Sequence, residues 1–120
     1  MTDRWTFTIP GRAPSTNHLY RPGATFGSRR KAPGVEEWQT VVAMIVRSAR
    51  PKGWVPGPQV RLTFDFYLCR EMDLDNALKA LDDSIAAALG VNDRTFLPNC
   101  RSKRKVSKMD ERIEVTVENA

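Results

Sequence analysis

The sequence is poor in several residue types that common protein chemistries need. Its 120 residues include one histidine, His18, and two cysteines, Cys69 and Cys100. One histidine excludes a metal centre built from several histidines, and two cysteines favour free thiols in a cytosolic protein over a disulfide framework. The longest apolar runs, 41–46 and 85–89, are too short to span a bilayer. The amino terminus lacks the apolar stretch of a signal peptide, so we expect a cytoplasmic protein with no membrane partner.

Length and hydrophobic content limit the fold. A chain of 120 residues has the size of one domain, and a hydrophobic share of 41% is too high for a disordered protein. A domain of this size buries enough surface to fold without disulfides. We therefore expect a single domain over residues 1–120.

Charge is distributed unevenly along the chain, whose formal net charge is +5. Residues 71–93 contain six acidic side chains and one basic one, whereas residues 94–108 contain six basic side chains and no acid. A second basic cluster lies at residues 29–31. Basic surface around an acidic centre suits a protein that holds a polyanion together with a divalent cation. The structural alternative is that these charges only solvate opposite faces.

Hydrophobic periodicity predicts two strands and two helices. Apolar residues alternate with polar ones at 5–9 and at 60–69, which is the pattern of half-buried strands. Apolar residues recur at helical spacing over 35–50 and 75–89, and Gly90 is placed to end the second helix. These are the clearest elements of the sequence.

The remaining segments are less regular. Residues 11–34 are rich in glycine, proline, serine and arginine, and predict a long loop that we expect to be mobile. A weak strand is predicted near 94–97, where Pro98 limits it to an edge, and a final hairpin is predicted from 101–106 and 112–118. The elements together predict an α+β fold, a small mixed β-sheet of about four to five strands with two main helices packed against it.

The candidate chemistry lies where the 60–69 strand meets the second helix. Asp73 and Asp75 occupy this corner, and residues two apart in extended backbone point the same way. Carboxylate oxygens are the ligands that Mg²⁺ prefers, and two or three of them suffice with water and phosphate. Asp93 supplies a third carboxylate if the chain returns antiparallel beside the strand. Lys79, one turn after Asp75, is placed to neutralise charge on a phosphoryl oxygen or to orient the attacking water.

Each of these residues also has a purely structural interpretation. Asp73 is a suitable helix N-cap, and Asp75 is a first-turn acid that complements the helix dipole. Lys79 would then pair with Asp75 or Asp83 on the helix surface. We interpret Asp82 and Asp83 as solvated helix acids.

Two motifs together resemble the RusA family of Holliday-junction resolvases of bacteria and their prophages. One is Asp73-Leu74-Asp75-Asn76 followed by Lys79 and Asp93. The other is the segment Pro14–Arg21, PSTNHLYR, which follows the first strand. The order of elements and the length are also similar over nearly the whole chain. The sequence departs from many members at Asn92, where they carry an acidic residue directly before the third aspartate.

The resemblance implies an Mg²⁺-dependent endonuclease that cuts four-way DNA junctions by paired symmetric nicks as a homodimer. Mg²⁺ is the implied cofactor, which Mn²⁺ can replace, and no nucleotide cofactor is implied. By position in the motifs, Asp73, Asp75 and Asp93 correspond to the metal-binding carboxylates and Lys79 to the catalytic lysine. The residues that would support the site are Asn17, Tyr20 and Asn76.

Recognition of a junction depends on shape and on phosphates rather than on base edges. The basic residues suited to contact phosphates are Arg21, Arg29, Arg30, Lys31, Arg101, Lys103, Arg104 and Lys105. A two-fold dimer would present one metal site to each of two opposed strands, and the protein would be bacterial or phage-encoded.

Three other functions are weighed against this one. A non-catalytic DNA-binding dimer would use the same basic surface, and a basic structural dimer would give the acidic corner no purpose. A haloacid-dehalogenase-type phosphotransferase also has Asp-x-Asp after a strand, but the chain is short for that fold and Asn76-Ala77 replaces the usual continuation.

Overall fold

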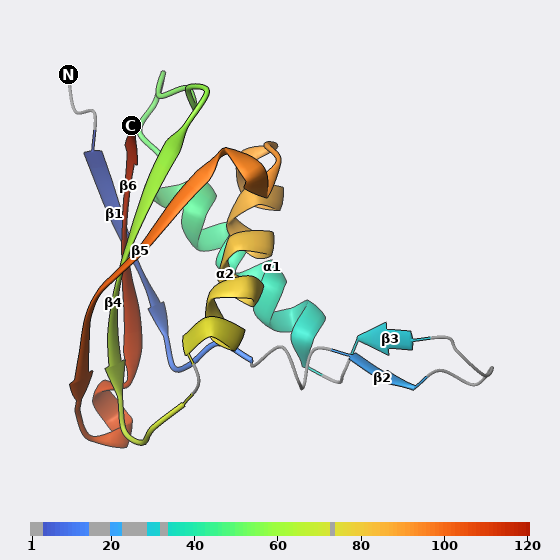
Figure 1. Cartoon of the computed structure of the whole chain (residues 1–120), viewed down its shortest axis with the longest axis vertical. Coiled ribbons are helices and arrows are strands. Elements are labelled where there is room, and N and C mark those ends of the chain that lie inside the picture. Colours follow the sequence, from blue (N-terminus) through green and yellow to red (C-terminus); the bar gives the residue numbers. More distant parts are fainter. Residues whose placement is uncertain (1–3, 15–19, 23–28, 32–33, 73) are drawn as a thin grey trace.

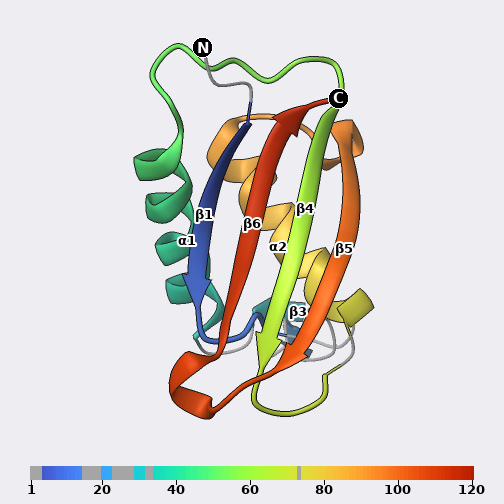
Figure 2. The same cartoon turned by 90° about the vertical axis from the view of Figure 1, so that its left-hand side faces the viewer.

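A computed structural model of the chain describes residues 4–14, 20–22, 29–31, 34–72 and 74–120, and of residues 20–22, 29–31 and 76 it describes the backbone only. Four strands form one mixed sheet in the order β1-β6-β4-β5: β1 (Arg4–Pro10), β4 (Val60–Leu68), β5 (Phe96–Lys105) and β6 (Arg112–Asn119). Helices α1 (Val35–Ala49) and α2 (Leu74–Leu89) lie on one face of this sheet and leave the other face open (Figures 1 and 2). The predicted α+β fold is confirmed. Within the described ranges, no helix combines the length and the apolar content needed to cross a membrane.

The core lies between the sheet and the two helices. On each of the three strands β1, β4 and β6, every second side chain points toward the helices and is buried, as the alternation predicted. The fully buried side chains include Leu62, Phe64 and Phe66 from β4 and Ile113, Val115 and Val117 from β6. The helices contribute Val42, Val46, Leu81 and Ile85, all 0% exposed. The predicted bounds of both helices agree with the observed ones to within one residue.

The predicted final hairpin is wrong. Strand β5 pairs in parallel with β4, and β6 pairs with β4 and β1 instead of with β5. The reason is the crossover through α2, which carries the chain back along the sheet so that β5 runs in the same direction as β4. The largely exposed β5 then occupies the edge, where Pro98 is tolerated because its missing N–H costs no sheet hydrogen bond.

The start of β5 also differs from the expectation. Residues 93–95 form a short 3-10 helix, η2 (Asp93–Thr95), and the strand begins only at Phe96. A second 3-10 helix, η3 (Lys108–Asp110), joins β5 to β6. Asp93 therefore precedes a strand parallel to β4, and the predicted antiparallel return is wrong.

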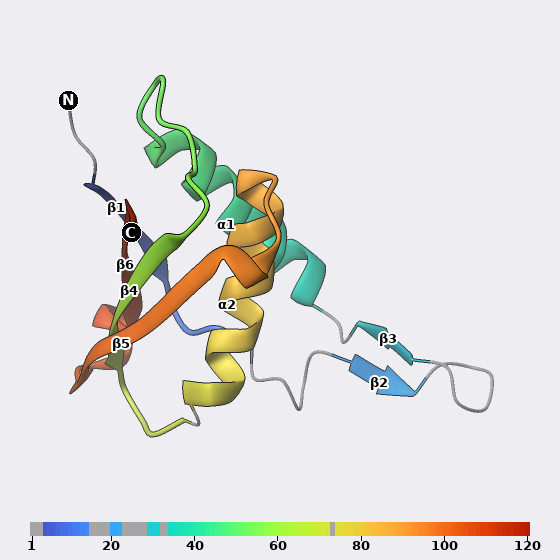
Figure 3. The ribbon, with the colours of Figure 1, turned by 45° about the horizontal axis from the view of Figure 1, so that its top comes forward.

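The 11–34 segment is not wholly irregular. It contains a short antiparallel ribbon of β2 (Tyr20–Pro22) and β3 (Arg29–Lys31), in which Arg21 lies opposite Arg30. Figure 3 shows this ribbon beyond the amino-terminal end of α1, away from the sheet. The prediction of a plain loop missed the ribbon because glycine and proline dominate the composition while its strands have only three residues each.

Candidate functional site

The second helix and the start of β5 bring Lys79, Asp83 and Asp93 together. The Lys79 ammonium donates a hydrogen bond to Asp83 Oδ1 at 3.1 Å and lies 3.7 Å from Asp93 Oδ2. Both carboxylates raise the pKa of Lys79, Asp83 more than Asp93. The lysine side chain is 56% exposed and each carboxylate 38%, so a ligand from solvent can reach this group of charges.

The backbone turn that follows α2 places Asp93 beside the helix. Gly90 has φ +72°, which ends α2 in the left-handed region that glycine adopts without strain. Asn92 then caps η2, since its side chain accepts a hydrogen bond from the Arg94 N–H at 2.9 Å. Asn92 thus shapes the turn that holds Asp93.

Asp82 belongs to the same cluster, although the sequence interpretation assigned it to solvent. Its Oδ1 is buried and accepts no hydrogen bond within the described part of the chain. The pKa of Asp82 is raised to about 6, chiefly by burial and also by the charges of Asp83 and Asp93, while the charge of Lys79 acts in the opposite direction. Helical spacing could have predicted that Asp82 lies near Lys79, because residues three and four positions apart lie on the same side of a helix.

Other predicted site residues are described only in part. Asp75 is exposed in the first turn of α2, one turn before Lys79. Asp73 and Asn17 lie outside the described residues, as does the side chain of Asn76. Among the described residues no group of three or more histidine, cysteine, aspartate or glutamate side chains is placed to hold a metal ion. The three-carboxylate site includes Asp73 and therefore stays a prediction.

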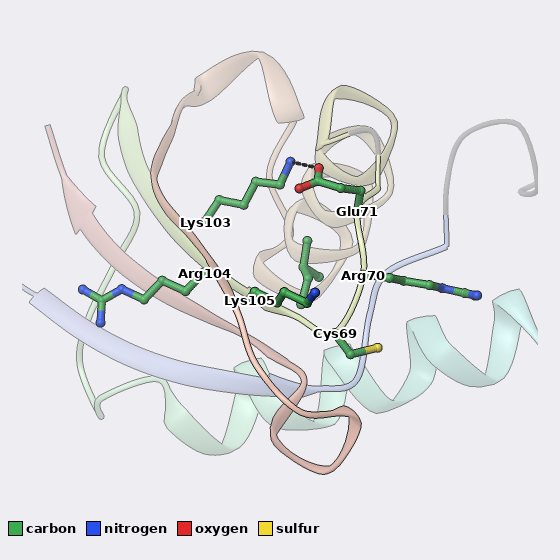
Figure 4. A pocket seen from close by; sticks show the side chains of 7 residues that line it. Cys69, Arg70, Glu71, Lys103, Arg104 and Lys105 are labelled. Atoms are coloured by element: carbon green, nitrogen blue, oxygen red, sulfur yellow. Dashed lines mark hydrogen bonds and ion pairs between the residues drawn. The ribbon is translucent and has the colours of Figure 1, made fainter.

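A basic pocket lies at the carboxyl ends of the parallel strands β4 and β5. Its volume is about 450 Å³, and it is lined by Leu68, Cys69, Arg70, Glu71, Lys103, Arg104 and Lys105. Lys103 reaches toward Glu71 and pairs with it at 2.5 Å, whereas Arg104 and Arg70 extend away in opposite directions (Figure 4). Ligands of open α/β sheets bind at this end of parallel strands. The pocket adjoins the connection that leads into α2.

A charged network ties this connection to the rest of the fold. The Glu111 carboxylate accepts hydrogen bonds from Arg12 Nη2 at 2.8 Å and from the Cys69 N–H at 2.9 Å. Arg12 also donates to the Arg70 carbonyl at 3.1 Å. Arg12, together with the Cys69 N–H, lowers the pKa of Glu111 to about 2. The network therefore fixes the backbone that leads from β4 toward Asp73.

Arg101, like Lys103, is a predicted phosphate contact that already has a carboxylate partner. Its Nε lies 3.1 Å and its Nη2 2.5 Å from the Asp65 carboxylate, which also accepts from the Ser102 hydroxyl at 2.6 Å. A β-bulge makes this possible, since the pairing shifts so that Ser102, not Arg101, lies opposite Asp65. The Arg101 pair lowers the pKa of Asp65. Among the described residues, the contacts of the Arg101 guanidinium with Asp65 use Nε and Nη2 and not Nη1.

The four basic residues predicted near the amino terminus, Arg21, Arg29, Arg30 and Lys31, all lie in the β2–β3 ribbon. Tyr20 lies opposite Lys31 at one end of it. Antiparallel pairing therefore gathers these basic positions in one short element. The positions of their side chains are outside the described residues.

The described site combines a partly buried carboxylate cluster with a lysine and, separately, a basic pocket. A lysine can stabilise charge on a phosphoryl group, and the basic pocket can bind an anion. No protein-family model matches the chain, and no curated protein matches it. The case for a function consequently depends on the residues and on this geometry.

Proposed function

We propose that this protein is a single-domain, Mg²⁺-dependent, structure-selective endodeoxyribonuclease that resolves four-way DNA junctions by paired symmetric nicks. It acts as a homodimer in the cytoplasm of a bacterium, encoded by the bacterium or by a phage. The proposal follows the resemblance of the two motifs to the RusA family.

The observation that supports it best is the pair between Lys79 and Asp93. Sequence reasoning selected both residues as catalytic although 13 positions separate them, and the ion pair joins them at 3.7 Å. The turn made by Gly90 and Asn92 is what brings them together. A cluster that only solvated the helix would not require Asp93 to fold back against it.

The donor set fits a hard divalent cation. Asp75 and Asp93 offer carboxylate oxygens, which Mg²⁺ prefers, and the 38% exposure of Asp93 leaves room for water or phosphate ligands. Asp73, Asp75 and Asp93 would hold the ion. When bound, it would lower the pKa of a water and stabilise charge on the phosphate.

The residues of the chain itself supply the remaining functions. Lys79 carries the positive charge of the cluster and is positioned to stabilise a phosphoryl oxygen when Asp93 turns to another ligand. Lys103, Arg104 and Lys105 present charge along the edge strand, where they position the DNA backbone without reading its sequence. The Asp82 carboxylate lies near Asp83, Asp93 and Lys79, where its negative charge when ionised lowers the local potential and favours a cation.

The deciding experiment compares a labelled four-way junction with a linear duplex, with and without Mg²⁺. The wild-type protein nicks the junction symmetrically in Mg²⁺ and leaves the duplex intact. Asp73→Asn, Asp75→Asn and Asp93→Asn each lower the nicking rate by about 100-fold or more, since metal stabilisation is worth several kcal/mol. Junction binding stays the same or becomes tighter because repulsion of phosphate falls. Lys79→Ala lowers turnover more than binding.

The matched control is Asp110→Asn. Asp110 is an exposed acid in η3 that accepts a hydrogen bond from Ser107, outside the acidic cluster. It should leave nicking unchanged. A protein that binds junctions with no Mg²⁺-dependent nicking, and whose binding ignores Asp73→Asn, would instead be the non-catalytic DNA-binding dimer. Full nicking by Asp73→Asn would refute the site assignment.

A further inference from the structure

The basic pocket at the ends of β4 and β5 contains an acidic side chain. Glu71 is the one carboxylate among the described residues that line the pocket, and its Oε2 lies 2.5 Å from the Lys103 ammonium. The partners differ in exposure, because the Lys103 side chain is 37% exposed and that of Glu71 86%. Figure 4 shows these two side chains pointing toward one another, whereas Arg70 and Arg104 point outward. In the free protein a carboxylate therefore neutralises the lysine at this pocket.

A β-bulge determines which basic side chains of β5 face the pocket. The register between β4 and β5 shifts by one residue at the bulge, so that Lys103 pairs with Phe66 and Lys105 with Leu68. Phe66 and Leu68 are buried against the helices, and paired residues of neighbouring strands lie on the same face of a sheet. Lys103 and Lys105 therefore lie on the helix side, next to the connection into α2, and Arg104 lies on the open side.

The backbone just before Glu71 is fixed, whereas its side chain is not. The Glu111 network holds the Cys69 N–H and the Arg70 carbonyl. Within the described ranges, Lys103 is the hydrogen-bond and ion-pair partner of the Glu71 side chain. Water screens a carboxylate that is 86% exposed, so this pair is weak and opens readily. Glu71 can therefore turn away from Lys103 without any movement of the strand.

We propose that the basic pocket binds one phosphate group of the DNA backbone, and that Glu71 competes with this phosphate for Lys103. Carboxylate and phosphate oxygens are both charged acceptors for an ammonium group, so Lys103 pairs with one of them at a time. Once Glu71 turns away, Lys103 and Lys105 lie two residues apart on the same side of β5, where both reach the same phosphate. The pair with Glu71 is the closed form of this site.

The competition weakens phosphate binding in proportion to the fraction of molecules in which Lys103 is already paired. An exposed ion pair of this kind changes an equilibrium by about 5-fold at most. Differences in affinity between related complexes lie mainly in the dissociation rate. Glu71 therefore makes bound DNA leave sooner, because its carboxylate replaces the departing phosphate on Lys103. The inference rests on the proposed function for the identity of the ligand as DNA.

The test measures binding without Mg²⁺, so that no strand is cut. Inorganic phosphate is titrated into the isotope-labelled full chain and followed by NMR, and a fluorescent four-way junction is followed by anisotropy. Glu71→Gln should tighten the binding of both probes by about 5-fold per pocket and slow dissociation of the junction by a similar factor. Lys103→Gln should weaken the binding of both by about 10-fold, because it removes a charged hydrogen bond to phosphate.

A double variant separates competition from general repulsion. In the Lys103→Gln background, Glu71→Gln should change phosphate affinity by less than about 2-fold, because the ion pair that it opens is already absent. Glu118→Gln is the matched control, since Glu118 pairs with Arg4 and Arg61 at the other end of the sheet. It should leave both affinities unchanged. None of the altered side chains lies in the core, so the circular dichroism spectrum and melting temperature should stay those of the wild-type protein.

Three results would overturn the proposal. One is unchanged affinity in Glu71→Gln, and another is equal tightening with and without Lys103. The third is an effect on inorganic phosphate with none on the junction, which would assign the pocket to a free anion instead of the DNA backbone. The nuclease is judged separately. The Glu71→Gln effect in a protein that never nicks junctions would keep the inference and remove the proposed enzyme, and Mg²⁺-dependent nicking without that effect would do the opposite.

Discussion

Replacing Glu111 by Gln removes a charge that joins three parts of the chain. The Glu111 carboxylate binds Arg12, which follows β1, and the Cys69 N–H, which follows β4. Glu111 directly precedes β6, and its backbone carbonyl accepts a hydrogen bond from the Gly11 N–H at 2.8 Å. The Gln side chain has the same shape, so the variant tests the charge and not the packing.

The magnitude follows from the pKa of Glu111. Its fall from 4.5 to about 2 corresponds to about 3.4 kcal/mol if solvent screened none of it. Arg12 is 25% exposed and the Glu111 side chain 9%, so screening reduces this value. A charged hydrogen bond in such a setting contributes about 1.5–3 kcal/mol. We expect Glu111→Gln to lower the free energy of unfolding by about 2 kcal/mol at pH 7.

The sign of the pH dependence makes the prediction specific. The folded pKa of Glu111 lies below the unfolded value of 4.5, so its contribution is present above pH 4.5 and is lost as the pH falls toward 2. Glutamine does not titrate. The stability difference between the wild-type protein and Glu111→Gln should therefore shrink from about 2 kcal/mol at neutral pH to near zero at pH 2.

Urea unfolding followed by tryptophan fluorescence measures this difference, because Trp5 and Trp54 are buried. Glu114→Gln is the matched control. Glu114 pairs with Arg112 at 2.9 Å and is 39% exposed. Glu114→Gln should therefore lower the free energy of unfolding by about 0.5 kcal/mol or less. A difference for Glu111→Gln that stayed constant from pH 7 to pH 2 would refute the argument from the charge.

Two further predictions follow from the cluster and the edge strand. Asp82→Asn should raise stability at pH 7 by about 1 kcal/mol, because the folded pKa of Asp82, about 6 against 3.8 unfolded, makes its ionisation unfavourable. This gain should disappear below pH 3.8, where Asp82 is protonated in both states; thermal unfolding across pH measures it, and a gain independent of pH would contradict it. Arg104→Ala with Lys105→Ala should weaken junction binding and lower the slope of log affinity against log salt by about 1.8 if both residues contact phosphates, whereas Lys52→Ala should leave the slope unchanged.

The acidic cluster shows how far sequence reasoning reaches. The spacing of Lys79 and Asp83 was enough to anticipate their pair, since residues four apart on a helix are neighbours. Asp93 was selected by its position in a motif, but the route by which it reaches Lys79 was predicted wrongly. The burial of Asp82 was not anticipated, because an acid at the edge of a helix stripe is usually solvated.

The order of strands was the larger error. The alternation of Ile113, Val115 and Val117 identified β6 but contained nothing about which strand lies beside it. Those three side chains are fully buried because β6 lies in the interior of the sheet, between β1 and β4. The polar β5 is tolerated at the edge. In the observed sheet β6 pairs with β4 along nearly its whole length. A hairpin that placed β5 between β4 and β6 would have removed this pairing.

The sequence alone determined the main helices and strands, the side of each that faces the core, and the pairing of Lys79 with Asp83 on the helix. These properties depend on the period of hydrophobic residues and on neighbours within a few positions, so a local pattern is sufficient for them. Strand order, the parallel course of β5, the Glu111 network and the closeness of Asp93 to Lys79 were decided only by the tertiary structure. They depend on contacts between segments far apart in the chain, whose free energies no local pattern contains.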